Sequence, residues 1–298
     1  MRPKRRLRWA AIPVGIAAAV ILAGCTTTEL NGYLPGFQDD GVQATNHTEM
    51  ISGLWVNSWI VLLVVGVITW GLTLFAMFAY RRRKGQTGLP VQLRYNMPIE
   101  IFYTLVPFVL VLGLFAFTAR DQTILETQYD DPDVSIVAIG KQWAWDFQYN
   151  GDEEDKSDAV WTMGVQATPA ANGDRDEASL PTLVLPVNKT VKIDLRSRDV
   201  IHSFWVIDFL YKKDMLPGKT NYMYVTPERE GTFSGKCAEL CGEYHSMMLF
   251  NVKVVSQDEY DAYIQSLEDA GQTGQLGHEY DRNQNLPGIG TPAHEEEE

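Results

Sequence analysis

Two long apolar runs dominate the hydrophobic pattern of the first 120 residues. Residues 54–80 form a run of 27 without a charge, and residues 101–119 form a second run of 19. A helix needs about 20 apolar residues to cross the hydrocarbon core of a bilayer. The pattern therefore predicts two transmembrane helices, at residues 54–80 and 99–120.

The loop between these helices, residues 81–98, sets their orientation. It opens with three arginines and a lysine, and it also contains Arg94. Short loops rich in Lys and Arg lie on the cytoplasmic side of a membrane. Everything after residue 120 is therefore predicted to lie outside the cytoplasm.

The first 24 residues are typical of a secretory signal. A basic leader precedes an apolar stretch, and Leu22-Ala-Gly-Cys25 supplies a small-residue cleavage site. This motif resembles a bacterial lipoprotein lipobox, so we expect Cys25 to be acylated and residues 25–53 to form an extracytoplasmic segment. An uncleaved membrane anchor is the alternative, although the apolar stretch is short for a spanning helix.

From residue 131 the pattern changes to short alternating runs rich in valine, isoleucine and aromatic residues. Such runs predict a membrane-anchored all-β sandwich or barrel over residues 131–256. The predicted strands are residues 134–139, 142–149, 183–187, 190–195, 222–226, 231–236 and 249–255. An acidic insertion at 151–180 is interpreted as a solvated loop or lid with little packing. Residues 257–298 are interpreted as a short amphipathic helix followed by a disordered acidic tail.

The net charge constrains the choice of partner. Residues 131–298 contain 14 Lys and Arg against 30 Asp and Glu, a net charge of −16. Such a field attracts cations and basic proteins and repels nucleic acid. A basic partner on the outer face is therefore favoured, although in the tail and the insertion the acidity is accounted for by solubility alone.

Candidate chemistry is concentrated in one loop, residues 237–248, between the last two predicted strands. The possible ligands are Cys237, Cys241, His245 and Met248, together with His202 from an earlier segment. Thiolate, imidazole and thioether ligands select copper over hard cations. The paired cysteines suggest two sulfurs that bridge two copper ions, each completed by one histidine. Ligands on a loop held by two strands indicate a cupredoxin-like domain.

Three simpler interpretations stay open from the residues alone. The two cysteines could form a disulfide in an oxidising compartment. The same cysteine and histidine set could bind zinc, although its spacing fits no common zinc pattern. Met248 alone is typical of core packing, but its position three residues after His245 favours a ligand.

Two further residues each have a functional and a structural interpretation. Glu100 stands at the cytoplasmic start of the second helix, where a carboxylate either snorkels to the interface or serves a proton path. The residues alone favour the interface. Trp143 lies in a predicted strand, where a half-buried aromatic side chain is the simpler interpretation.

The combined pattern resembles subunit II of cytochrome c oxidase, a haem-copper terminal oxidase. The resemblance rests on the two transmembrane helices, the cupredoxin-like domain, a histidine 35 residues before the first loop cysteine, and the motif Cys-x-x-x-Cys-x-x-x-His-x-x-Met. It covers residues 50–255. The lipobox and the acidic insertion are more similar to the actinobacterial branch than to mitochondrial forms.

The resemblance implies a dinuclear copper A centre. Its ligands would be the side chains of His202, Cys237, Cys241, His245 and Met248 and the backbone carbonyl of Glu239. The Glu239 side chain would bind a magnesium or manganese ion at the boundary with subunit I. Haem would be present in the partner subunit only.

The resemblance also implies roles away from the copper ligands. Trp143 matches the exposed tryptophan through which the family receives electrons. Glu100 matches a glutamate at the mouth of a proton-uptake channel that leads into subunit I. Lys141 and Ala144 stand where the family commonly has a histidine and an aromatic residue. Candidates for an acidic docking rim are Asp146, Asp208 and Asp214.

The implied function is to accept electrons from cytochrome c and pass them to haem in subunit I, for oxygen reduction coupled to proton pumping. The implied partners are subunits I and III, a soluble or membrane-fixed cytochrome c, and membrane lipid. Oxygen chemistry would lie elsewhere, because the predicted membrane helices contain no histidine and His47, His278 and His294 lie in apparently unstructured flanks. The implied location is a bacterial cell membrane that the chain crosses more than once, with the copper domain outside.

Three rival classes account for less of the sequence. An extracytoplasmic copper chaperone for oxidase assembly would also have paired cysteines, but with a thioredoxin-like alternation of strands and helices and one membrane anchor. A quinol oxidase subunit would lack the thiolates. A nitrous oxide reductase would lack the membrane hairpin.

Overall fold

The computed structural model describes residues 27–38, 41–89, 92–150, 158–167 and 179–276. The predicted signal at 1–24, the acylation site Cys25, His278, His294 and the acidic tail lie outside these residues. The chain divides into two compact units, a helical unit of residues 50–124 and a β-rich unit that contains most of the remainder.

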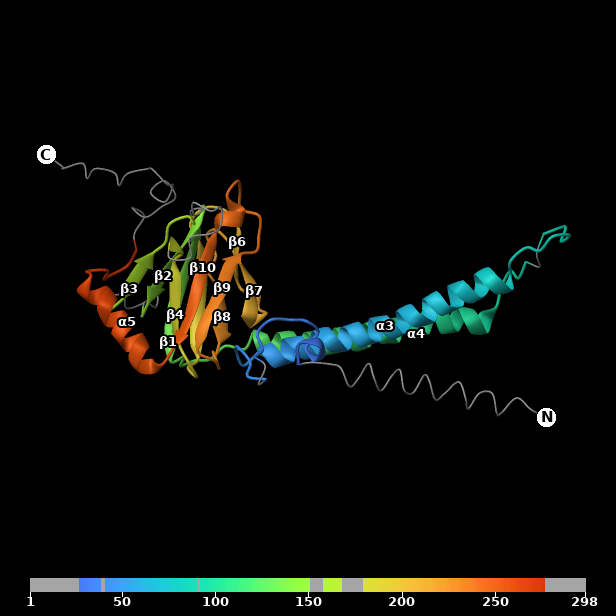
Figure 1. Ribbon diagram of the computed structural model, residues 1–298, viewed down its shortest axis with the longest axis horizontal. Helices are drawn as coiled ribbons and strands as arrows, with labels where there is room; N and C mark the ends of the chain where they lie inside the picture. Colours follow the sequence, from blue (N-terminus) through green and yellow to red (C-terminus); the bar gives the residue numbers. More distant parts are fainter. Residues whose placement is uncertain (1–26, 39–40, 90–91, 151–157, 168–178, 277–298) are drawn as a thin grey trace. The chain divides into compact units, whose positions relative to one another are not determined.

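The helical unit is built from two helices, α3 (Thr48–Ala79) and α4 (Met97–Leu125) (Figure 1). Within the part of the chain that the structure describes, these two are long and apolar enough to cross a membrane. Both helices begin before their apolar runs, and polar residues cap the first turn of α4. The Glu100 carboxylate, for example, accepts a hydrogen bond from the backbone N–H of Asn96 at 2.8 Å, as in a capping box.

The β-rich unit is a sandwich of two five-stranded sheets, which confirms the predicted cupredoxin-like fold. The first sheet has the order β3-β2-β1-β5-β8, formed by β1 (Val134–Lys141), β2 (Ala144–Tyr149), β3 (Val160–Met163), β5 (Val191–Ser197) and β8 (Asn221–Val225). The second has the order β4-β10-β9-β6-β7, formed by β4 (Thr182–Pro186), β6 (His202–Val206), β7 (Lys212–Met215), β9 (Gly231–Cys237) and β10 (Leu249–Val255). Shorter elements are α2 (Thr27–Leu30) and the 3-10 turns η2 (Ile207–Phe209) and η3 (His245–Met247). Helix α5 (Gln257–Asp269) packs beside β3 and β4 (Figure 1).

Aromatic rings fill the space between the two sheets. Trp145 of β2 lies 4.9 Å from Phe250 of β10, and Phe250 stacks on Phe204 of β6, also at 4.9 Å between ring centroids. A Cβ atom at Gly235 would come within 2.2 Å of the Phe250 ring, so glycine is required there. Burying each large ring contributes about 1.5–3 kcal/mol. This packing fixes β6, β9 and β10, the strands that carry the candidate site.

Three strands were not predicted, each for a local reason. Strand β6 has only five residues and begins with histidine and serine, whereas the edge strand β7 is mostly polar. Strand β3 lies inside the insertion 151–180, which was expected to be a solvated loop. That expectation is wrong for residues 160–163, because β3 pairs with β2. The predicted strand at 142–149 begins later, at Ala144, because the hairpin closes with Lys141 opposite Ala144.

The segment before α3 is ordered against the sandwich. The backbone N–H of Asn46 donates to the carbonyl of Thr226 at 3.1 Å, and the Thr226 N–H donates to the Asn46 side chain at 2.9 Å. His47 is 4% exposed, and its Nε2 lies 3.2 Å from the carbonyl oxygen of Tyr224. The expectation that His47 lies in an unstructured flank is therefore wrong. Burial lowers the pKa of His47.

Candidate metal centre

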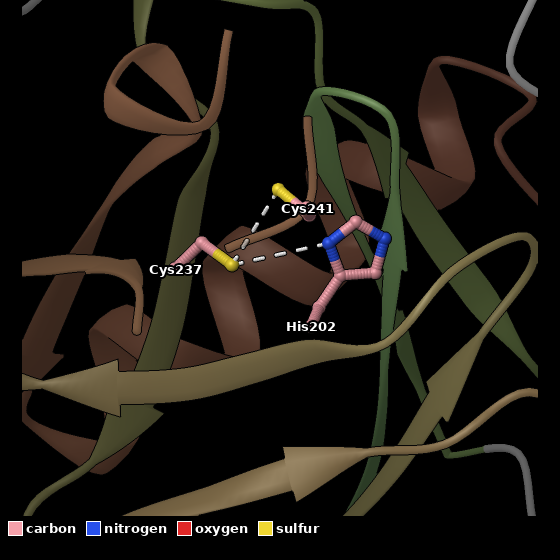
Figure 2. A group of neighbouring side chains, drawn as sticks. All are labelled: His202, Cys237 and Cys241. Atoms are coloured by element: carbon pink, nitrogen blue, oxygen red, sulfur yellow. Dashed lines mark hydrogen bonds between the residues drawn. The ribbon is translucent and has the colours of Figure 1, made fainter. Parts of the chain in front are cut away.

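Three of the predicted ligands converge at one end of the second sheet (Figure 2). His202 begins β6, Cys237 ends β9, and Cys241 follows in the loop toward β10. The Cys237 sulfur lies 3.8 Å from the Cys241 sulfur and 3.9 Å from Nδ1 of His202. All three ligand atoms lie within 4.8 Å of one another, close enough to bind metal ions together.

The loop between β9 and β10 brings the other two predicted side chains to the same place. The turn η3 places Nδ1 of His245 at 3.5 Å from the Cys241 sulfur. The Met248 sulfur lies 3.7 Å from the same sulfur, and the Met248 carbonyl accepts from the backbone N–H of Cys237 at 3.0 Å. The loop thus closes on itself at the point where β9 and β10 begin to pair. All five predicted side chains belong to one cluster.

The cluster is largely shielded from solvent. His202 and Met248 are fully buried, and the two cysteines are 3% and 4% exposed. Cys237 and Cys241 are free thiols, so the structure does not form the disulfide that the residues left open. Buried thiols that face imidazole nitrogens are suited to bind a metal once they lose their protons.

Hydrogen bonding inside the cluster separates the acidities of the two thiols. The hydrogen bond with Cys241 lowers the pKa of Cys237 below its ordinary value, and further bonds from His202 and from backbone groups act in the same direction. The same contact raises the pKa of Cys241. Cys237 therefore loses its proton more readily than Cys241, and a metal ion bound to both sulfurs would displace the remaining proton.

His202 is oriented by a carboxylate that was not predicted. Asp199 lies 2.8 Å from Nε2 of His202, on the opposite side of the ring from Cys237. Burial opposes protonation of His202, but the hydrogen bonds with Asp199 and Cys237 outweigh it and raise its pKa. A carboxylate that holds the second nitrogen of a ligating histidine fixes the ring for a metal. The sequence offered one indication of this contact, namely that Asp199 lies only three residues before His202.

The hairpin between β1 and β2 supports the same loop. The Gln142 backbone N–H donates to Asp199 at 2.7 Å, while its side-chain amide donates to the Cys241 carbonyl at 2.6 Å. The ring of Trp145 donates to the Met248 carbonyl at 3.3 Å. A Cβ atom at Gly140 would come within 3.0 Å of the His202 ring, so a side chain there would displace the imidazole.

The donor set fits copper. It offers two thiol sulfurs, two imidazole nitrogens and a thioether, and the carbonyl oxygen of Glu239 lies 3.1 Å from the Cys237 sulfur. Soft ligands of this kind favour copper over hard cations. The Glu239 side chain is exposed, while its carbonyl lies at the cluster.

Two expectations about the docking surface are wrong. The Trp143 side chain is buried, at 7% exposure, although the resemblance implied an exposed tryptophan. Its ring packs against Tyr244 and Gly242. Asp146 is fully buried and pairs with Lys141 at 2.7 Å, so it cannot belong to a docking rim. The other rim candidates are accessible: Asp208 is partly exposed and Asp214 is exposed.

The chain is similar to known oxidase subunits. Residues 134–255 match the family model "Cytochrome C oxidase subunit II, periplasmic domain". The "Probable cytochrome c oxidase subunit 2" of Streptomyces avermitilis is 42% identical, over 95% of this chain and 96% of that protein. The "Cytochrome c oxidase subunit 2" of Mycobacterium tuberculosis is 33% identical, over 88% and 83%. A solved periplasmic domain of subunit II of cytochrome oxidase from Bradyrhizobium japonicum is 28% identical, with a TM-score of 0.41, over 48% of this chain and 99% of that chain.

Proposed function

This chain belongs to the cytochrome c oxidase subunit II family, and from that premise we propose that it accepts electrons from a c-type cytochrome at a two-copper centre. It then delivers them to haem in subunit I, for oxygen reduction coupled to proton pumping. The observation that carries the proposal is the convergence of the His202, Cys237 and Cys241 ligand atoms within 4.8 Å. Membership places the chain in a haem-copper oxidase complex, with other oxidase subunits as partners.

The ligand assignment follows from the contacts within the cluster. Cys237 and Cys241 would both hold the copper pair, because their sulfurs lie 3.8 Å apart and each lies near one histidine nitrogen. His202, His245, Met248 and the Glu239 carbonyl would complete the set. When bound, such a copper pair supplies a one-electron acceptor and donor at a site that the protein holds rigid.

The protein's contribution is to keep that site dry and fixed. Asp199, in the connection between β5 and β6, holds His202, and Gln142, in the turn between β1 and β2, holds the Cys241 carbonyl. The β9–β10 pairing holds the cysteine loop. Because these groups are already hydrogen-bonded and buried, little rearrangement is needed when the charge of the site changes. A preorganised site of this kind favours rapid electron transfer.

Further roles are proposed with the same partners. The exposed Glu239 carboxylate would bind magnesium or manganese at the boundary with subunit I, since hard oxygen ligands suit hard cations. Glu100, at the start of α4, would stand at the mouth of a proton-uptake channel. Trp143 would lie on the electron path into the cluster. Cytochrome c, subunits I and III and membrane lipid complete the proposed partners, with Cys25 as the lipid anchor.

A copper chaperone has less support. In the described residues, the unit that holds the cysteines is a sandwich of two sheets rather than an alternation of strands and helices. A chaperone would also be expected to release copper to an acceptor, whereas this cluster is buried and closed by backbone hydrogen bonds.

A stopped-flow experiment tests the proposal. Oxidised, purified oxidase is mixed anaerobically with reduced cytochrome c, and the copper and haem absorbance bands are followed separately. We expect the copper band to respond before the haem of subunit I, and Cys241→Ser to abolish both responses. Haem reduction at the wild-type rate in a copper-free Cys241→Ser complex would contradict the proposal.

A further inference from the structure

The copper loop, residues 237–248 between β9 and β10, presents the ring of Tyr244 to solvent, and the nearby ring of Trp143 lies beneath the surface. Tyr244 is 39% exposed, whereas Trp143 is 7% exposed. The two rings meet edge to face, with centroids 5.0 Å apart at 73°. Gly242 is also close to the indole, because a Cβ atom there would come within 3.0 Å of the Trp143 ring. A partner that approaches this loop therefore meets the phenol before the indole.

Tyr244 is connected to the proposed metal site in two ways. It directly precedes His245, whose Nδ1 lies 3.5 Å from the Cys241 sulfur. It also packs on Trp143, whose neighbour Gln142 donates to the Cys241 carbonyl at 2.6 Å. A short route through bonds and a short route through packed rings both begin at this side chain.

We propose that Tyr244 is the residue that the haem edge of the donor cytochrome contacts, with Trp143 behind it as the next ring on the path. This inference rests on the proposed function. One electron leaves the ferrous haem of the donor, which becomes ferric, and the copper pair gains that electron. No bond forms and no proton moves, because both rings serve only as the medium between the two redox groups.

The surface around Tyr244 suits such a partner. Leu240, on the same loop, is 78% exposed and adds apolar contact area. Glu243, beside Tyr244, is exposed and places a negative charge at the edge of this surface. A c-type cytochrome with an exposed apolar haem edge inside a ring of lysines complements an apolar centre with acidic surroundings.

The test compares Tyr244→Ala, Tyr244→Phe and Tyr129→Ala in the purified oxidase. Tyr129 is a matched control, because it is 44% exposed and also packs against an aromatic ring, that of Tyr224 at 5.5 Å. The measurements are the Kd for oxidised cytochrome c, the separate kcat and KM, the copper content and absorption spectrum, and the rate of reduction by a small reductant.

We expect Tyr244→Ala to weaken binding and lower kcat/KM for cytochrome c about tenfold or more, as loss of a central interface aromatic does. The copper spectrum and the rate with the small reductant should not change. Tyr244→Phe keeps the ring and should restore most of the loss, whereas Tyr129→Ala should behave as wild type.

Three results would overturn the inference. Tyr244→Ala that behaves as Tyr129→Ala would show that the ring is not a contact. Faster uptake in Tyr244→Ala would show that the ring shields Trp143. A changed copper spectrum with equal slowing by both reductants would show that Tyr244 only supports the loop. None of these three results would contradict the proposed function. That proposal fails separately if copper-free Cys241→Ser still passes electrons at the wild-type rate.

Discussion

Replacement of Lys141 by methionine should destabilise the β-rich unit strongly, because it leaves a buried carboxylate without its main counter-charge. Lys141 and Asp146 have fully buried side chains, 2.7 Å apart. Burial raises the pKa of Asp146 although Lys141 and Arg198 attract its charged form. The pair closes the hairpin whose turn contains Gln142 and Trp143, so its loss should also loosen the support of the copper loop.

The expected magnitude follows from these contacts. Removing one partner of a buried ion pair costs about 3–5 kcal/mol. Lys141→Met should lie near the lower end, because Arg198 Nε remains 4.0 Å from Asp146 and the Gly164 N–H still donates to it. Asp146→Asn should lie near the upper end, because two buried cations then face a neutral amide. At about 2–4 °C per kcal/mol for a unit of this size, the losses in Tm are about 6–12 °C and 10–20 °C.

The assay is thermal unfolding of the purified protein, followed together with loss of the copper absorption. The double variant Lys141→Met, Asp146→Asn removes both charges and should be less destabilised than the sum of the two single variants, by about 2 kcal/mol or more. A Lys141→Met protein within about 1 kcal/mol of wild type would refute the reasoning, as would strict additivity in the double variant.

Three further predictions concern the surroundings of the site. Asp199→Ala should lower copper affinity about 10- to 100-fold, because the ring of His202 loses its orienting partner; competition with a copper chelator measures this, and an unchanged affinity would refute it. Gly140→Ala should shift the copper absorption spectrum, since the new Cβ would lie 3.0 Å from the His202 ring; an identical spectrum would show that the ring has room to move. His47 has a pKa below its ordinary 6.5, so the unfolded form binds the proton more readily and protection of residues 44–48 should fall as pH drops below about 6.5. Hydrogen exchange checks this against His47→Gln, which should show less pH dependence; equal dependence in both proteins would count against the assignment.

The ligand residues could be predicted because their residue types and their spacing along the chain are typical of a copper site. Cys237, Cys241, His245 and Met248 occupy one loop, and the flanking strands alternate clearly enough to be recognised. The two membrane helices could be predicted equally well, since an uncharged apolar run of that length is typical of a bilayer-spanning helix. The ends of these helices were harder to predict. The Glu100 carboxylate, for example, accepts from the Asn96 N–H and caps a first turn that precedes the apolar run.

The supporting groups were harder to predict. Gln142 reaches the site through contacts between distant segments, because its turn meets Asp199 and the Cys241 carbonyl. Asp199 lies only three residues before His202, but the sequence alone does not show that its carboxylate meets the imidazole. Asp146 was mistaken for a surface acid because its partner Lys141, five residues away, gave no sign of burial. An exposed Trp143 was implied by the family resemblance, whereas the residues alone favoured a half-buried ring; in the structure the Tyr244 ring packs against it.

Copper content and absorption of the purified protein, compared between wild type and Cys237→Ser, test the central claim most directly. We predict two coppers per chain and a mixed-valence spectrum in the wild type, and loss of both in the variant together with electron uptake. A Cys237→Ser protein that still holds two coppers and accepts electrons at an undiminished rate would contradict the account.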